Sequence, residues 1–168
     1  MVRGFSNKGA SFLQSIEQLR SYPYNDQTGS EIKHWVKGAT IGYGHLIDFT
    51  EWTMFGKSYV KGIPECVANW LFFNDLEPFV EVVNECCGNA GLNQSQFDAL
   101  VILAFNIGES NFRNSSVVKI LNGQDTNYDT LADAWKAWRK SQGKVMQGLI
   151  NRRQAELNIY YNNVYEKW

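Results

Sequence analysis

Apolar side chains recur at helical spacing near the start of the chain, where Phe12, Ile16 and Leu19 predict a helix over residues 11–20. The period is lost in the stretch that follows, residues 21–48. That stretch mixes glycines and a proline with aromatic and β-branched residues, which is typical of hairpins. A small sheet is therefore expected directly after the first helix.

The rest of the chain is dominated by helical patterns. A helix should begin at Pro64, and Pro78 is expected to interrupt or kink it. A strongly apolar helix should follow, capped by Asn93 or Ser95 and closed by Gly108. Further helices are expected over residues 115–122, 128–141 and 148–168. Together these elements predict an α+β protein.

Length and composition indicate one globular domain spanning residues 1–168. Of the 168 residues, 44% are hydrophobic and 20% are charged, which is enough to bury a core. No apolar run approaches the roughly eighteen residues of a membrane span, and the N-terminus lacks the apolar segment of a secretory signal. Neither a membrane span nor a signal peptide is therefore predicted.

The residues that usually hold metals are few. Cys66, Cys86 and Cys87 form no CxxC motif, and His34 and His45 show no metal-ligand spacing. The cysteines are expected to be unpaired thiols in a reducing compartment. No metal and no cofactor is predicted.

Charge is unevenly distributed, although the net charge is only −1. The segment from Glu65 to Asp98 has acidic but no basic residues, and the segment from Lys136 to Arg153 has the reverse. Each cluster is ordinarily a solvated face. The alternative for the basic cluster is contact with an anionic polymer. Its density is too low for a nucleic-acid groove, so no nucleic-acid partner is predicted.

Two carboxylates near the first helix are candidates for acid–base chemistry. Glu17 falls in the last turn of that helix, where the partial negative charge of the helix carbonyls favours a protonated acid. Asp26 lies in the polar turn NDQTG and should stay ionised. One protonated and one ionised carboxyl group is the pattern of glycoside hydrolysis. The alternative is structural, with Glu17 capping carbonyls through water and Asp26 forming an Asx turn.

A third motif favours the catalytic interpretation. Glu17 and Asp26, separated by eight residues and followed by the run TIGYGHL from Thr40, resemble the active-site pattern of the phage-type lysozyme, or endolysin, family of muramidases. Later segments resemble family landmarks in the same order: LNQSQFDALVILAFNIG (92–108), FRNSSVVKILNG (112–123), AWKAW (134–138) and GLINRRQAE (148–156).

The resemblance implies a lysozyme-like fold and a function. The fold would combine a β-rich lobe at about residues 20–62 with a larger helical lobe formed by residues 1–19 and 63–168, and the active-site cleft would lie between them. The function would be cleavage of the β-1,4 bond between N-acetylmuramic acid and N-acetylglucosamine in peptidoglycan. The family commonly inverts the anomeric carbon, which requires carboxyl groups about 6.5–9.5 Å apart.

The resemblance also implies roles for individual residues. Glu17 would be the general acid, Asp26 would position and help activate the attacking water, and Thr40 would hold that water through its hydroxyl group. Leu46 would lie at one lip of the cleft. The two residues Phe105 and Asn106 would line the opposite, helical side, with Phe105 either in the core or in the cleft wall.

Two neighbouring features are interpreted as structural. His45 is expected to make hydrogen bonds that hold a loop, because a lone histidine beside a glycine turn usually does so. Arg152 and Arg153 resemble arginines that fix the last helix beneath the active site, and no chemistry is assigned to them.

The sequence departs from the family pattern between Gly29 and Thr40. The family usually has about two residues there, whereas this chain has SEIKHWVKGA. If the added residues lengthen the hairpin symmetrically, Asp26 and Thr40 should still face each other. Trp35 in this insertion is either a platform for a sugar or a packed aromatic. The net charge also lacks the positive sign common in the family.

Other functions on the same fold stay open. A lytic transglycosylase would cut the same bond by internal cyclisation, and an inactive module would only bind glycan. The biological setting is either phage lysis, with release through a holin pore, or delivery by a secretion system as an antibacterial effector with an immunity partner. In both settings we expect a monomer that is made in a bacterial cytoplasm and acts on peptidoglycan strands in the periplasm or wall.

Overall fold

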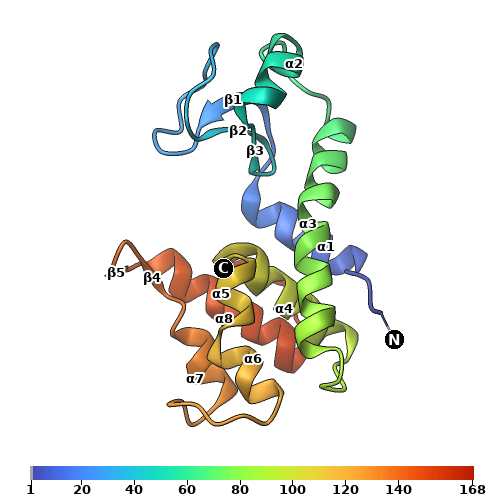
Figure 1. Cartoon of the computed structure of the whole chain (residues 1–168), viewed down its shortest axis with the longest axis vertical. Coiled ribbons are helices and arrows are strands. Elements are labelled where there is room, and N and C mark those ends of the chain that lie inside the picture. Colours follow the sequence, from blue (N-terminus) through green and yellow to red (C-terminus); the bar gives the residue numbers. More distant parts are fainter. Residues whose placement is uncertain (1) are drawn as a thin grey trace. The chain divides into compact units, whose positions relative to one another are not determined.

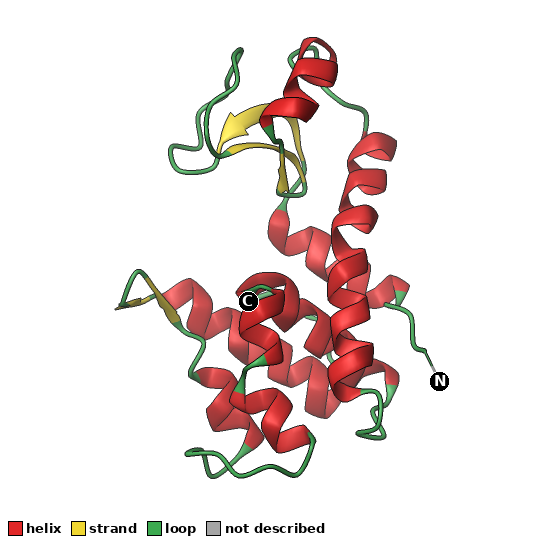
Figure 2. Cartoon of the chain, viewed as in Figure 1, coloured by secondary structure: helices red, strands yellow, loops and turns green. Residues whose placement is uncertain are grey.

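The chain folds into two units, which a computed structural model describes over residues 2–168 (Figure 1). The sheet unit is Gln14–Leu76, and the helical unit comprises the chain up to Leu13 together with Glu77–Trp168. Both boundaries fall inside helices, namely α1 (Asn7–Glu17) and α3 (Glu65–Cys87). Helices predominate and the strands are few and short (Figure 2), which confirms the α+β class.

Helix α1 both begins and ends earlier than predicted. It stops at Glu17 rather than near Arg20, because Gln18 adopts a left-handed conformation with φ of 58°. The Gln18 amide still donates to the carbonyl of Gln14 at 3.1 Å, which closes the final turn. Glu17 is therefore the last helical residue, and the strand begins only three positions later, at Arg20.

The predicted hairpins are confirmed as one antiparallel sheet. The strands are β1 (Arg20–Asn25), β2 (Ala39–Gly42) and β3 (His45–Leu46), in the order β1-β2-β3. The turn between β2 and β3 requires glycine at both ends, since Gly42 and Gly44 have φ of 66° and 91°. The glycines of the TIGYGH run thus serve the backbone of this tight turn.

The insertion does not lengthen the hairpin symmetrically. Residues 30–32 instead pair with the outer edge of β1, where the Asn25 amide donates to Ser30 and the Ile32 amide donates to Pro23, both at 2.9 Å. The chain then continues to the opposite edge of β1 and pairs with it as β2. Thr40 consequently keeps its register, directly opposite Tyr24 of β1.

A helix that the sequence patterns did not predict follows the sheet. Helix α2 (Phe49–Tyr59) is capped by Asp48, whose side chain accepts a hydrogen bond from the Glu51 amide at 2.8 Å. Trp35 from the insertion packs beside its first turn, with its ring 5.3 Å from that of Phe49 and its Nε1 donating to the Ile47 carbonyl at 3.0 Å. The β-rich segment therefore also contains a helix.

Of the two outcomes expected at Pro78, an interruption or a kink, the interruption is wrong, because α3 continues through Pro78 to Cys87. Proline cannot donate to the carbonyl four residues earlier, which here belongs to Asn74. Both Pro78 and Asn74 are exposed, so solvent can satisfy that carbonyl. The boundary between the two units lies at Leu76, close to this missing hydrogen bond.

The helical unit is built around α4 (Gln94–Ile107), whose apolar side chains from Phe97 to Ala104 are almost fully buried. The predicted caps are confirmed: Asn93 forms a capping box with Gln96, and Gly108 closes the helix with φ of 89°. Around α4 lie α5 (Glu109–Arg113), α6 (Ser116–Leu121), α7 (Leu131–Lys136) and α8 (Gln147–Asn162).

The last two helices are shorter than predicted. Helix α7 ends before Ala137, and the chain then forms a hairpin of β4 (Lys140–Ser141) and β5 (Lys144–Val145). Helix α8 ends at Asn162, and the next residue, Asn163, is left-handed with φ of 57°. Over residues 2–168, no helix has the length and apolar character needed to cross a membrane.

Candidate active site

Glu17 lies at the C-terminal end of α1, as predicted, and is partly buried. Its carboxylate faces the β2–β3 turn, since Oε2 is 4.0 Å from the position that a Cβ atom would take at Gly44. The end of α1 and the tight turn of the TIGYGH run therefore meet at one carboxyl group.

Asp26 and Thr40 are joined through a single carbonyl group. The Asp26 amide, just past the end of β1, donates to the Gly38 carbonyl at 2.9 Å. The Thr40 hydroxyl donates to the same oxygen at 3.1 Å. Asp26 is exposed, whereas only 5% of Thr40 is exposed. This shared acceptor fixes the threonine hydroxyl beside the backbone that carries the aspartate.

Gly38 also makes room for the Asp26 side chain. A Cβ atom at position 38 would overlap the Asp26 carboxylate oxygen Oδ1. The residue has φ of +87°, which L side chains rarely adopt. Glycine is thus required here both by the backbone conformation and by the close approach of the carboxylate.

Tyr24 links the two carboxylates electrostatically. Burial raises the pKa of its phenol, the Arg20 cation lowers it, and the negative charges of Glu17 and Asp26 raise it further, with a net upward shift. The Arg20 guanidinium lies 4.0 Å from the centre of the tyrosine ring. Both carboxylates therefore act on the same phenol, and a cation covers its ring.

A row of side chains crosses the sheet at this level. Tyr24 pairs with Thr40, and Thr40 pairs with Leu46, so these three positions share one face of the sheet. Leu46 is 63% exposed, which is unusual for a leucine next to a buried threonine. The row gives the sheet unit an accessible apolar position directly beside the predicted water-holding hydroxyl.

These residues supply the groups that glycoside hydrolysis needs. One carboxyl group is partly buried at a helix end, a second is exposed, and a fixed hydroxyl lies beside the second. Across residues 2–168, no cluster of three or more His, Cys, Asp or Glu side chains is arranged to hold a metal ion. The chemistry available to these groups is proton transfer and the positioning of water.

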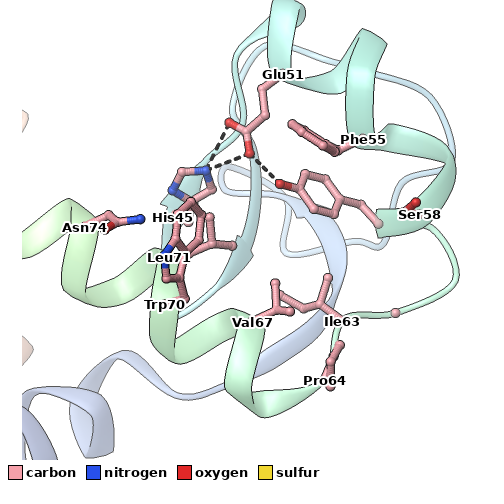
Figure 3. A pocket seen from close by; sticks show the side chains of 12 residues that line it. His45, Glu51, Phe55, Ser58, Ile63, Pro64, Val67, Trp70, Leu71 and Asn74 are labelled. Atoms are coloured by element: carbon pink, nitrogen blue, oxygen red, sulfur yellow. Dashed lines mark hydrogen bonds and ion pairs between the residues drawn. The ribbon is translucent and has the colours of Figure 1, made fainter.

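His45 has the structural role that was predicted for it. Its Nδ1 lies 2.9 Å from Asp75 of α3. Its Nε2 lies 3.0 Å from Glu51 of α2 (Figure 3). Burial acts to lower the pKa of His45, but the hydrogen bonds and charges of Asp75 and Glu51 outweigh it and raise the pKa overall. The Tyr59 hydroxyl also donates to Glu51, at 2.6 Å.

The remaining predicted residues lie in the helical unit. Phe105, near the end of α4, packs edge-on against Phe79 with ring centres 5.3 Å apart. Asn106 is exposed, and its Oδ1 accepts a hydrogen bond from Arg153 Nη2 at 2.6 Å. Arg152 and Arg153 are buried and both contact Glu156. Their structural interpretation agrees with this buried ion cluster.

The sequence analysis missed Tyr24, Arg20 and Gly38. Their parts in the site depend on strand register and on one left-handed residue, which no local motif encodes. One signal was available for the tyrosine, because Tyr24 precedes Asp26 by two positions and strand side chains alternate with a period of two. That spacing places Tyr24 on the same side as the aspartate.

Comparisons with known proteins are consistent across sequence and structure. The family model described as phage lysozyme matches residues 14–156. The endolysin of Salmonella phage P22 is 33% identical over 92% of this chain and 96% of its own length. The endolysin of Bacillus phage B103 is 32% identical over 92% of this chain, which spans only 53% of that relative. The structure of the endolysin from Escherichia coli O157:H7 phage FAHEc1 matches with a TM-score of 0.75, 30% identity and 98% coverage of both chains.

Proposed function

Because the chain belongs to the phage lysozyme family, we propose that it is a muramidase that hydrolyses the β-1,4 bond between N-acetylmuramic acid and N-acetylglucosamine in peptidoglycan. The observation that supports this most is that Glu17 faces the β2–β3 turn while Asp26 and Thr40 hydrogen-bond to the same Gly38 carbonyl in the same sheet unit. A binding module would need no such pair of carboxyl groups beside a fixed hydroxyl.

In the proposed mechanism Glu17 is the general acid. It gives its proton to the glycosidic oxygen as the bond from that oxygen to the anomeric carbon breaks. The position of Glu17 at the end of α1, with its carboxylate facing the β2–β3 turn, suits this role. The leaving sugar then departs with a neutral hydroxyl group.

Asp26 and Thr40 are proposed to act on the attacking water. The Thr40 hydroxyl donates its hydrogen to Gly38, so its oxygen keeps lone pairs that can accept a hydrogen bond from water. Asp26 accepts the other proton of that water while the water oxygen bonds to the anomeric carbon. The product would carry an inverted centre, as expected when water attacks directly.

Three further residues are proposed to contact the glycan. Leu46 is exposed beside Thr40 on the sheet face. Phe105 and Asn106 at the end of α4 are the proposed contacts from the helical unit. Substitution of each by alanine should raise KM for purified peptidoglycan more than it lowers kcat, because these side chains would bind substrate without taking part in proton transfer.

The test is the Glu17→Gln variant assayed on purified peptidoglycan. Loss of the proton donor should reduce the rate by about two to four powers of ten while the circular dichroism spectrum is unchanged. Glu31→Gln is the matched control, because Glu31 is an exposed carboxylate that pairs with the other edge of β1. Wild-type hydrolysis by Glu17→Gln would contradict the proposal.

Mass spectrometry of the fragments released by the wild-type protein separates the alternatives. Reducing, hydrated ends are expected for a hydrolase. Anhydro ends would identify a lytic transglycosylase, and no release would identify a glycan-binding module.

For the biological setting, we propose that the protein reaches the wall only after release or delivery. Expression with an added export signal should then lyse cells, while cytoplasmic expression without a pore-forming partner should not.

A further inference from the structure

A pocket lies in the sheet unit, between α2 and the first half of α3 (Figure 3). Its volume is about 540 Å³, within the roughly 300–1,000 Å³ of pockets that hold small organic ligands. None of Glu17, Asp26 and Thr40 lines it. The pocket is therefore a separate feature from the candidate active site.

The walls of this pocket are apolar and partly aromatic. Ile63 and Leu71 form buried parts of the wall, and Val67 lies between them along the chain. Phe55 from α2 and Trp70 from α3 also line it, although 48% and 64% of these two residues are exposed. Large aromatic side chains that stay this exposed around a pocket are typical of a binding site.

One end of the pocket is negatively charged. Glu51 and His45 line it, and Asp75 binds the far side of the His45 ring at 2.9 Å. Two carboxylates thus share one imidazole, so the group keeps a net negative charge even when His45 is protonated. In the part of the chain that the structure describes, no lysine or arginine forms an ion pair with Glu51 or Asp75.

The Glu51 carboxylate retains capacity for another donor. Oε1 accepts from the Tyr59 hydroxyl at 2.6 Å and faces His45 Nε2 at 3.0 Å. Among residues 2–168, the hydrogen-bond partner of Oε2 is that same imidazole nitrogen alone, also at 3.0 Å. A carboxylate offers about four lone-pair sites. Figure 3 shows Glu51 extending from α2 next to Phe55, so this oxygen pair and an aromatic ring adjoin each other.

We propose that this pocket binds a small organic cation, a primary amine joined by a short linker to an aromatic or branched apolar body. The apolar body would pack on Val67 and between the rings of Phe55 and Trp70. The ammonium group would donate to Glu51 and balance the excess negative charge. Two interactions favour a cation here: the quadrupole of the aromatic rings attracts it to their faces, and the negative charge of the carboxylate attracts it directly.

The charge of the pocket selects against other ligands of the same shape. A carboxylic acid would bring a third negative charge beside Glu51 and Asp75, which costs free energy at short range. A neutral alcohol could fill the apolar part and hydrogen-bond to Glu51, but would leave the excess charge unbalanced. The order of affinity should be amine first, then alcohol, then acid.

Phenethylamine is the probe, with 2-phenylethanol and 3-phenylpropionate as its neutral and anionic counterparts. Binding is measured by isothermal titration calorimetry and by NMR shifts of the amides of α2 and α3. We expect saturable binding of the amine, weaker binding of the alcohol and none of the acid. Absence of amine binding, or equal binding of all three, would overturn the proposal.

Two matched pairs of variants test the contacts. Trp70→Ala should weaken amine binding by about threefold or more, while Phe73→Ala, another exposed aromatic one turn along α3 that does not line the pocket, should not. Glu51→Gln keeps the hydrogen bonds of His45 and Tyr59 but removes the charge, and should make the amine and the alcohol bind alike. Glu65→Gln, outside the pocket, should preserve the preference. Unchanged binding by both Trp70→Ala and Glu51→Gln would exclude this site.

Discussion

At the scale of single residues, one backbone carbonyl organises two of the proposed catalytic groups. The Gly38 oxygen accepts from the Asp26 amide and from the Thr40 hydroxyl, so a small motion of Gly38 moves both groups together. The carboxylate of Asp26 also lies where the side chain of any other residue at position 38 would begin. Gly38 therefore controls the geometry of the site without any functional group of its own.

Replacement of Gly38 by alanine should consequently damage activity more than stability. The left-handed backbone should cost about 1 kcal/mol of folding free energy, whereas displacement of Asp26 should lower kcat/KM by about a hundredfold. Gly29→Ala is the control, because Gly29 is also left-handed, at φ of +70°, but its nearest neighbour is Arg20 Nη1 at 4.0 Å. Equal activity of the two variants in a peptidoglycan assay would show that the Asp26 position does not matter.

The sequence motif identified some residues of the site and not others, for a physical reason. Glu17 and Asp26 are separated by eight residues and Thr40 opens the TIGYGH run, so these local patterns are enough to select them although the segment between Gly29 and Thr40 is longer than in the family. Tyr24 and Gly38 matter because the strand register brings them beside Asp26, and register depends on the path of the whole insertion. Residues 30–32 pair with the edge of β1 that faces away from β2, and no local pattern in the insertion indicates this pairing.

At the scale of elements, His45 connects three of them. It lies on β3 and contacts Glu51 of α2 and Asp75 of α3, which places one imidazole between two carboxylates. The raised pKa of His45 means that the folded state holds the proton more tightly than the unfolded chain does. We call the two contacts of His45, with Glu51 and with Asp75, the histidine clamp. This clamp is therefore strongest when the imidazole is protonated.

The free energy of unfolding should fall as the pH rises through the folded-state pKa of His45. Below the ordinary histidine pKa of about 6.5 both states are protonated and the stabilisation is fully present. Above it the unfolded chain loses its proton first, so stability declines until the folded state has also titrated. Urea denaturation at a series of pH values, compared between wild type and His45→Gln, measures this contribution.

His34→Gln provides the control for the pH series. His34 is exposed in the insertion and takes part in none of the ion pairs found among residues 2–168. Its variant should keep the wild-type decline, whereas His45→Gln should flatten it. A flat profile in the wild-type protein would mean that the clamp contributes no pH-dependent stability.

Elements with local signals were predictable, and those fixed by tertiary context were not. Helix α4 carries its caps in its own sequence, at Asn93 and Gly108, and its bounds agree with the prediction. Helix α2 was missed although Asp48 and Glu51 stand at capping-box spacing, because its aromatic residues also suit a hairpin. Pro78 was overvalued as a helix breaker because its exposure could not be known.

At the scale of the whole molecule, the basic segment from Lys136 to Arg153 divides into two parts with different roles. Arg152 and Arg153 are buried around Glu156, whose Oε2 also accepts from Trp135 Nε1 at 2.7 Å. These contacts join α7 to α8, and Arg153 reaches α4 through Asn106. The arginines thus hold the helical unit together and are not available to an external polymer.

Loss of Glu156 should therefore destabilise the protein strongly. Glu156→Ala removes the carboxylate that both buried arginines contact, and Nε and Nη1 of Arg153 already have no hydrogen-bond partner among the described residues. The expected loss is about 3–5 kcal/mol, measured by urea denaturation. Glu166→Ala, an exposed glutamate beyond α8, should change the stability by less than about 0.5 kcal/mol.

The other four basic residues of the segment are exposed, and two of them, Lys140 and Lys144, lie on the β4–β5 hairpin. If this hairpin attracts an anionic cell wall, replacing both by glutamine should raise KM on intact walls severalfold without changing kcat. Lys57→Gln with Lys61→Gln changes the net charge equally but at exposed positions around the end of α2, and should leave KM unaltered. Repeating the KM measurements at high salt tests whether the effect is electrostatic. At about 1 M salt the screening length falls to about 3 Å, so an electrostatic difference in KM between wild type and the hairpin variant should vanish. A difference that persists at high salt would instead indicate a packing role for the two side chains.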